Sequence, residues 1–116
     1  MGIRSILAKP FASIIDKQTK RWAAQPGQSQ EGIRSRIVAK AANTRFGKDH
    51  HFSELQSYDD FKKSVPIKDY EELKPYFDLI VEGKPDIMWP GKPAYLSKTS
   101  GTTSGTKYIP ITKDAI

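Results

Sequence analysis

The strongest constraint on the fold is a change of hydrophobic pattern after Gly83. Up to that residue, apolar side chains recur at steps of three, four or seven, the spacing of one helix face. From Lys84 onward, proline and glycine interrupt the chain, and two short apolar runs flank a segment of Ser, Thr and Gly. The pattern predicts a helical region over residues 1–83, followed over residues 84–116 by a strand–loop–strand unit and the start of a helix.

Helices are expected at four places in the first region. Residues 3–22 and 68–83 have helical spacing, although Pro10 and Pro75 interrupt them. Pro10 should kink the first helix or open its second part, and Pro75 should bend or stop the last one. A third helix should follow Ser29 as its cap, with Ile33, Ile37, Val38 and Ala41 on one side.

Turn and capping residues set the remaining boundaries. Residues 25–28 should form a turn, and Gly47 should end the preceding helix in the left-handed conformation. Gly83 should mark the end of the last helix. Ser57 and Asp60 resemble a capping box, which predicts a short helix that stops before Pro66.

The positive charge lies entirely in the first half of the chain. The net charge is +6, yet residues 1–50 hold ten basic and three acidic side chains, and residues 51–116 hold nine and ten. A nucleic-acid footprint is one interpretation. The solvated faces of amphipathic helices are the favoured one, because no five-residue basic run occurs. A basic N-terminal helix also suits a membrane surface or a transit peptide, although packing against the rest of a protein is preferred.

Residue types exclude several kinds of chemistry. The chain has no cysteine, which excludes disulfides, thiolate catalysis and Cys-containing zinc sites. His50 and His51 are adjacent and so point in different directions, which makes them poor joint metal ligands. We therefore predict no metal site here, a loop that ends in a buried Phe52, and Trp89 as a core anchor. No apolar run is long enough to span a membrane, and we expect a cytoplasmic protein.

The most informative segment is the run of Ser, Thr and Gly before Lys107. Glycine lets the backbone approach a ligand closely, successive N–H groups can surround an anion, and a lysine adds a point charge for phosphate. The alternative is a flexible Ser/Gly linker. The P-loop pattern does not match, because Gly101 and Gly105 are four apart and Tyr108 follows the lysine. The candidate phosphate-binding residues are Thr99, Ser100, Gly101, Thr102, Thr103, Ser104, Gly105 and Lys107.

This segment resembles the phosphate loop of the adenylate-forming superfamily, whose signature is [ST]-[SG]-G-[ST]-T-G-x-P-K. Ser104 and Thr106 depart from that signature. Together with the segment that follows, Tyr108-Ile-Pro-Ile-Thr112, these two differences resemble one branch of the superfamily more closely. That branch is the auxin-responsive Gretchen Hagen family of acyl acid amido synthetases and its bacterial relatives. Other blocks similar to that branch are Asn43-Thr-Arg-Phe-Gly-Lys48, Tyr58-Asp-Asp-Phe61, Val65-Pro-Ile-Lys-Asp-Tyr70 and Gly91-Lys-Pro93.

The resemblance implies the N-terminal part of the large domain of an α/β ligase, over residues 1–116. Such an enzyme uses ATP and Mg²⁺ to adenylate a carboxylic acid, and an amine or amino acid then displaces AMP. The loop would hold the β- and γ-phosphates, and the rest of the enzyme chain would complete the site. We expect the 116 residues alone to be inactive. Two alternatives remain, a stand-alone basic module for nucleic acid or an acidic partner, and a nucleotide-binding protein with a convergent phosphate loop.

Overall fold

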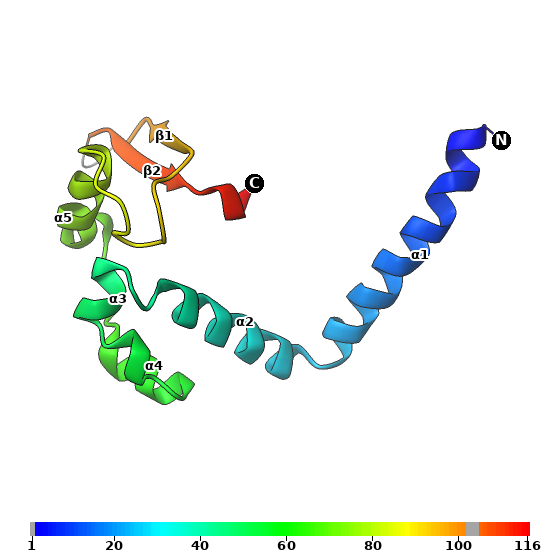
Figure 1. Ribbon diagram of the computed structural model, residues 1–116, viewed down its shortest axis with the longest axis horizontal. Coiled ribbons are helices and arrows are strands. Elements are labelled where there is room, and N and C mark those ends of the chain that lie inside the picture. Colours follow the sequence, from blue (N-terminus) through cyan, green and yellow to red (C-terminus); the bar gives the residue numbers. More distant parts are fainter. Residues whose placement is uncertain (1, 102–104) are drawn as a thin grey trace. The chain divides into compact units, whose positions relative to one another are not determined.

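The computed structural model describes residues 2–101 and 105–116, and the chain divides into two units, residues 1–34 and 35–116. Within the described residues the protein is mostly helical, with one two-stranded antiparallel hairpin, as the sequence predicts (Figure 1). The elements are α1 (Ile3–Ala24), α2 (Pro26–Ala41), α3 (Arg45–Asp49), the 3₁₀ turn η1 (Phe52–Glu54), α4 (Tyr58–Ser64), α5 (Tyr70–Val81), β1 (Tyr95–Thr99), β2 (Lys107–Ile111) and the 3₁₀ turn η2 (Lys113–Ala115).

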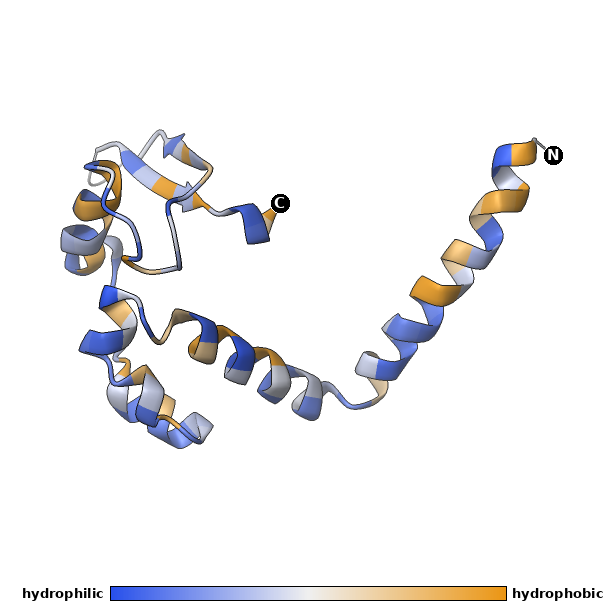
Figure 2. Cartoon of the chain, in the orientation of Figure 1, coloured by the Kyte–Doolittle hydropathy of each residue, from blue (hydrophilic) through white to orange (hydrophobic). Residues whose placement is uncertain are grey.

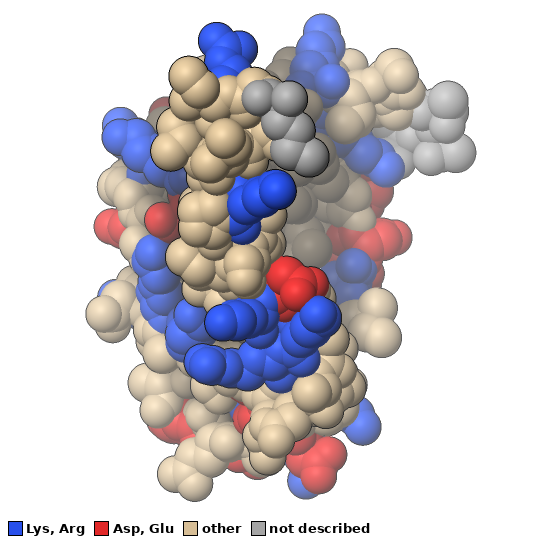
Figure 3. Space-filling view, turned by 90° about the vertical axis from the view of Figure 1, so that its right-hand side faces the viewer, with Lys and Arg blue, Asp and Glu red and all other residues tan. Residues whose placement is uncertain are grey.

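Helix α1 is continuous through Pro10 and has no buried residue. Ile3 and Phe11 of this helix are 78% and 67% exposed. The ribbon of α1 has several orange stretches in Figure 2, which mark its hydrophobic positions. Helix α1 also carries Arg4, Lys9, Lys17, Lys20 and Arg21, and Lys and Arg side chains are drawn in blue in Figure 3. No helix in the described part of the chain is long and apolar enough to cross a membrane.

The turn predicted at residues 25–28 is replaced by a single residue, Gln25, between two helices. Helix α2 begins at Pro26 because the first helical position needs no N–H donor and the φ angle of proline already suits a helix. Ser29 is therefore inside α2 and does not cap it. Its hydroxyl instead donates to the Trp22 carbonyl at 3.1 Å, near the C-terminal end of α1.

The core of the second unit forms around the end of α2. Val38, Ala41 and Phe52 are buried, and Ala42, Phe46, Leu55, Phe61, Val65 and Trp89 pack against them. The predictions of a buried Phe52 and of Trp89 as a core anchor are confirmed. Ile37 was expected on the same side as Val38 but is 48% exposed, as is Ile33 in the first unit.

Thr44 fixes the tight connection between α2 and α3. It is 1% exposed, its hydroxyl donates to the Ala41 carbonyl at 2.6 Å, and it accepts the Gly47 N–H at 3.0 Å as the cap of α3. Gly47 lies inside α3 and has no left-handed conformation, so its predicted role was wrong. A Cβ atom on Gly47 would collide with the Ala41 carbonyl, so glycine is required there by close backbone approach.

Helix α3 joins the core to the later elements. The N–H groups of Arg45 and Phe46 donate to the Asp86 and Ile87 carbonyls at 2.9 and 2.8 Å, which satisfies two free donors at the helix start. The Phe46 ring meets Tyr76 of α5 edge-on, with 5.1 Å between centroids. Burial, and then the hydrogen bond that the hydroxyl donates to Asp49, raise the pKa of Tyr76 to about 12.

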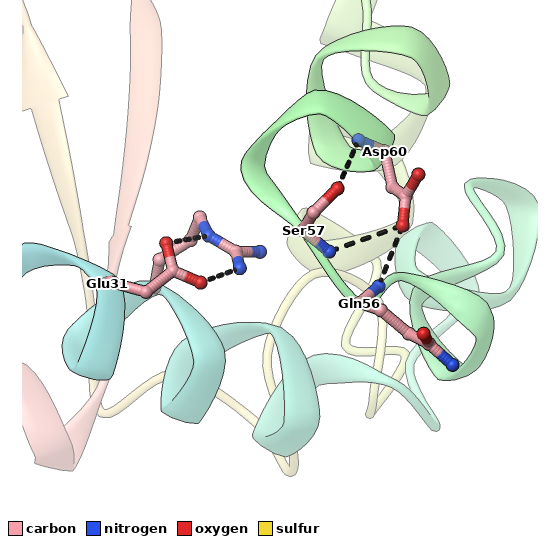
Figure 4. A network of polar contacts seen from close by, with 5 residues as sticks. Glu31, Gln56, Ser57 and Asp60 are labelled. Carbon is pink, nitrogen blue, oxygen red and sulfur yellow. Dashed lines mark hydrogen bonds and ion pairs between the residues drawn. The ribbon is translucent and has the colours of Figure 1, made fainter.

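Capping boxes begin both α4 and α5. Ser57 accepts the Asp60 N–H, and the Asp60 carboxylate accepts the N–H groups of Gln56 and Ser57 (Figure 4). Asp69 and Glu72 make the equivalent pair at the start of α5. The sequence predicted both helices. It also predicted the capping box of α4 and the end of α4 before Pro66.

Helix α5 ends as expected but does not stop at its proline. Gly83 adopts φ +88°, and its N–H donates to the Ile80 carbonyl at 3.0 Å. The helix continues through Pro75 to Val81, so the early stop predicted as one possibility there was wrong.

The chain end is tied to α2 through Asp114. The Asp114 carboxylate accepts hydrogen bonds from the Lys40 ammonium at 2.6 Å and from the Trp89 indole at 2.9 Å. The hydrogen bond from Lys40, followed by that from Trp89, lowers the pKa of Asp114. The predicted helix start after Thr112 is present only as the 3₁₀ turn η2, and the Thr112 side chain makes no capping hydrogen bond.

Replacing Gly47 with Ala should destabilise the chain by about 3 kcal/mol, because backbone atoms must move to admit the methyl group. The matched control is Gly32→Ala in α2, where nothing lies within 4 Å of the added Cβ. That control should be neutral or stabilising by up to about 1 kcal/mol. Urea unfolding measures both, and equal effects of the two substitutions would contradict the close approach at Ala41.

Removing the Lys40 charge with Lys40→Met should raise the pKa of Asp114 toward its ordinary value. A lowered carboxyl pKa stabilises the folded chain above the unfolded pKa, and this contribution disappears as the pH falls through the folded pKa. NMR titration of the Asp114 carboxyl measures the shift. Lys62→Met serves as the control, because Lys62 contacts the Tyr58 ring, and an identical pKa in both variants would refute the Lys40 contact.

Candidate functional site

The predicted phosphate loop connects the two strands of the hairpin. The register pairs Thr99 with Lys107 and Lys98 with Tyr108. Directly opposed residues in an antiparallel pair project from the same face, and successive residues alternate, so Thr99 and Lys107 share one face and Lys98 lies on the other. The expected strand–loop–strand context is confirmed, with Thr99 and Lys107 as the last and first strand residues.

Five of the eight candidate residues are described, and they lie together at the base of the loop. Thr99, Gly101 and Lys107 are partly buried, whereas Ser100 and Gly105 are exposed. Thr102, Thr103 and Ser104 lie outside the described residues.

The two glycines have different roles at the loop base. Gly105 adopts φ +77°, a left-handed conformation that glycine enters without strain. A Cβ on Gly101 would collide with the Gly105 carbonyl oxygen, so these two backbone segments approach more closely than any other residue type permits. Glycine is thus needed at 105 for its φ angle and at 101 for the contact. Both needs agree with the sequence argument that small residues shape this loop.

The lysine of the loop lies over an aromatic ring that the sequence reasoning did not select. The Lys107 ammonium is 5.4 Å from the centroid of the Tyr70 ring. Among the described residues, no carboxylate lies within 4.0 Å of that ammonium. The charge of Lys107 is therefore not neutralised by an ion pair in this part of the chain, and it is available to an anion.

Tyr70 also holds the start of β2. Its hydroxyl accepts the Tyr108 N–H at 3.1 Å, and its ring stacks on Phe77 at 4.7 Å between centroids. The helical spacing of Tyr70 and Phe77 marks them as members of one helix face, but nothing local in the sequence links Tyr70 to Lys107. The contact depends on α5 packing beside β2.

A separate apolar pocket lies toward the far end of the hairpin from the loop. It is formed by the end of α5, the turn-rich segment after it, Pro110 of β2 and Thr112 just after that strand. Its lining residues are Ile80, Lys84, Ile87, Met88, Trp89, Gly91, Pro93, Pro110 and Thr112. None of the predicted phosphate-binding residues contributes to it, so it is distinct from the loop.

Chemically, the loop base combines a cation, a hydroxyl-rich segment and closely approaching backbone. These are the groups that hold polyphosphates in proteins. The sequence model of the GH3 family N-terminal domain matches residues 15–116. The chain belongs to the GH3 family. This agrees with the resemblance found in the loop and in the blocks before it.

Several curated relatives support the assignment to the GH3 family. The chain is 30% identical over 89 residues to indole-3-acetic acid-amido synthetase GH3.15 of Arabidopsis thaliana, covering 75% of this chain and 15% of the relative. It is 31% identical over 107 residues to 4-substituted benzoates-glutamate ligase GH3.12 of the same plant, covering 85% and 18%. The rice protein named probable indole-3-acetic acid-amido synthetase GH3.13 is 38% identical over 58 residues, covering 48% and 12%.

This GH3 chain spans less than a fifth of the length of these curated relatives. No solved structure matches it.

Replacing Gly101 with Ala should loosen the loop base, because the added methyl group pushes against the Gly105 carbonyl. The amide of Tyr108 should then exchange with solvent at least about tenfold faster, as its hydrogen bond to Tyr70 opens more often. Gly27→Ala is the control, since nothing lies within 4 Å of its Cβ position and Gly27 does not have a positive φ angle. Unchanged protection of Tyr108 in Gly101→Ala, measured by NMR hydrogen exchange, would contradict the described loop geometry.

Proposed function

We propose that this chain is the N-terminal part of an ATP-dependent acyl acid amido synthetase and supplies its phosphate-binding loop. One observation supports this most strongly: in a GH3 chain, the hairpin closes a Ser/Thr/Gly loop with a lysine at its base that has no carboxylate partner among residues 2–101 and 105–116. The names of the relatives, which describe amido synthetases and an amino-acid ligase, support the reaction class. The adenylate-forming fold of the whole domain is part of the same proposal.

The proposed reaction has two steps. A carboxylate oxygen of the acid attacks the α-phosphorus of ATP, and the bond to the β-phosphate oxygen breaks to release pyrophosphate. An amine, such as that of an amino acid, then attacks the acyl carbon of the acyl-adenylate, and AMP leaves with the electrons of the broken C–O bond. The amine gives up a proton as the amide forms.

The loop would act on the departing pyrophosphate. Negative charge grows on the β-phosphate oxygen as its bond to the α-phosphorus breaks, and fixed donors at that point lower the barrier. Lys107 would supply a full positive charge, and the Ser100, Thr102 and Thr103 hydroxyls would donate hydrogen bonds. Mg²⁺, when bound, would share the neutralisation of the phosphates. Gly101 and Gly105 would permit the backbone geometry at the loop base, and Thr99 and Ser104 are the remaining proposed phosphate-binding residues.

The remainder of the enzyme would supply the acid and amine pockets and the metal ligands. For this reason we propose that the 116 residues bind ATP weakly and do not turn over alone. The proposed partners of this chain are therefore the rest of its own protein and small-molecule substrates.

In the full-length protein, Lys107→Ala should weaken MgATP binding about tenfold or more, because a charge-assisted contact to phosphate is lost. Lys98→Ala is the matched control, since Lys98 lies one residue from the end of β1 but on the opposite face of the hairpin. It should change the dissociation constant less than about twofold. Isothermal titration calorimetry with MgATP measures both.

Equal effects of the two lysine substitutions would argue for a nonspecific loss of positive charge and against a phosphate contact at Lys107. Nucleotide hydrolysis by the full-length protein without any carboxylic acid would count against adenylation. It would instead favour a nucleotide-binding protein of another kind.

A further inference from the structure

We propose that Tyr70 is a positioning residue for Lys107, and that its ring orders the lysine for phosphate before ATP binds. The inference rests on the proposed function, because it assigns a role at that same loop. Tyr70 lies outside the loop, 37 positions before Lys107 in the chain. The two meet only because the first turn of α5 lies beside β2.

The Tyr70 ring is itself held from three directions. Its face stacks on Phe77 with an interplanar angle of 15°, and its hydroxyl accepts the Tyr108 N–H. Tyr70 is also the first residue of α5 and directly follows Asp69, the N-cap of that helix, so its backbone is held in the helix. A ring with these constraints cannot rotate freely, so it offers Lys107 a fixed surface.

Lys107 is in turn held at both ends of its side chain. Its Cγ lies 3.7 Å from the Cβ position of Gly101, so the stem runs against the loop backbone, and its ammonium lies over the Tyr70 ring. A lysine loses considerable side-chain freedom when it binds a phosphate. In this structure, the contacts of the Lys107 side chain with the loop backbone and with the Tyr70 ring already restrict part of that freedom.

A neutral ring suits this purpose better than a carboxylate. The π face attracts the ammonium through its quadrupole but brings no net negative charge, so the charge of Lys107 remains effective at a phosphate. A carboxylate at the same place would hold the lysine more tightly and cancel its charge. The ammonium also has three N–H donors, and a contact on one side leaves the others for an anion.

The test is a double-mutant cycle on the full-length protein, with MgATP as the titrated probe. Tyr70→Leu should raise the dissociation constant about fivefold, since the ring is lost. Tyr70→Phe keeps the ring and should stay within about twofold of the unmodified protein. In a Lys107→Ala background, Tyr70→Leu should add no further loss, because the residue that it positions is absent.

Tyr58→Leu is the matched control, because Lys62 lies 5.3 Å over the Tyr58 ring in a similar contact away from the loop. It should leave MgATP binding unchanged. An equal loss from Tyr70→Leu in both Lys107 backgrounds would overturn the inference by assigning Tyr70 a merely structural role. An unchanged dissociation constant in Lys107→Ala itself would overturn both this inference and the proposed function, whereas a failed cycle with a weakened Lys107→Ala overturns only the inference.

A second variant keeps the test decisive if Tyr70→Leu does not fold. Pentafluorophenylalanine at position 70 preserves the shape of the Phe ring but removes the electron density from its face. Compared with Tyr70→Phe, it should weaken MgATP binding by about the same fivefold factor. Equal affinity of these two ring variants would overturn the inference.

Discussion

The second unit depends on the close approach of backbone between the end of α2 and the middle of α3. Thr44 closes this turn with a hydroxyl that is simultaneously donor to Ala41 and acceptor from Gly47. A buried hydroxyl without partners would destabilise the turn, and here it has one on each side. The direction of α3 is fixed by this arrangement, and with it the positions of Phe46 and of the two N–H groups at the helix start.

Helix α3 is connected to the predicted phosphate loop in two ways. The N–H groups of Arg45 and Phe46 hold the segment at residues 86–87 that leads into the hairpin. The Phe46 ring packs against Tyr76 of α5, and the first residue of the same helix, Tyr70, contacts Lys107 and the Tyr108 N–H. The start of β2 at the loop base is therefore supported from α5, and a binding site that is ordered in advance loses less entropy when a ligand binds.

Sequence reasoning succeeded where the determining interaction is local. The Ser57–Asp60 capping box, the end of α5 at Gly83 and the hairpin around the loop depend on residues a few positions apart, and all were predicted. It failed at Gly47, because the atom that requires glycine there is a carbonyl of the preceding helix and not the φ angle of residue 47. It also missed Tyr70, whose contact with Lys107 exists only once α5 packs beside β2. The family followed from the loop and from the blocks before it, and the match over residues 15–116 confirms it.

The central claim is that the loop between β1 and β2 holds the β- and γ-phosphates of ATP. A crystal structure of the full-length protein with Mg²⁺ and a non-hydrolysable ATP analogue tests it directly. The account predicts phosphate oxygens within about 3.2 Å of the Lys107 ammonium and of N–H or hydroxyl donors in residues 99–107. A triphosphate bound elsewhere in the protein, with Lys107 still over Tyr70 and no phosphate oxygen in reach of the loop, would contradict it.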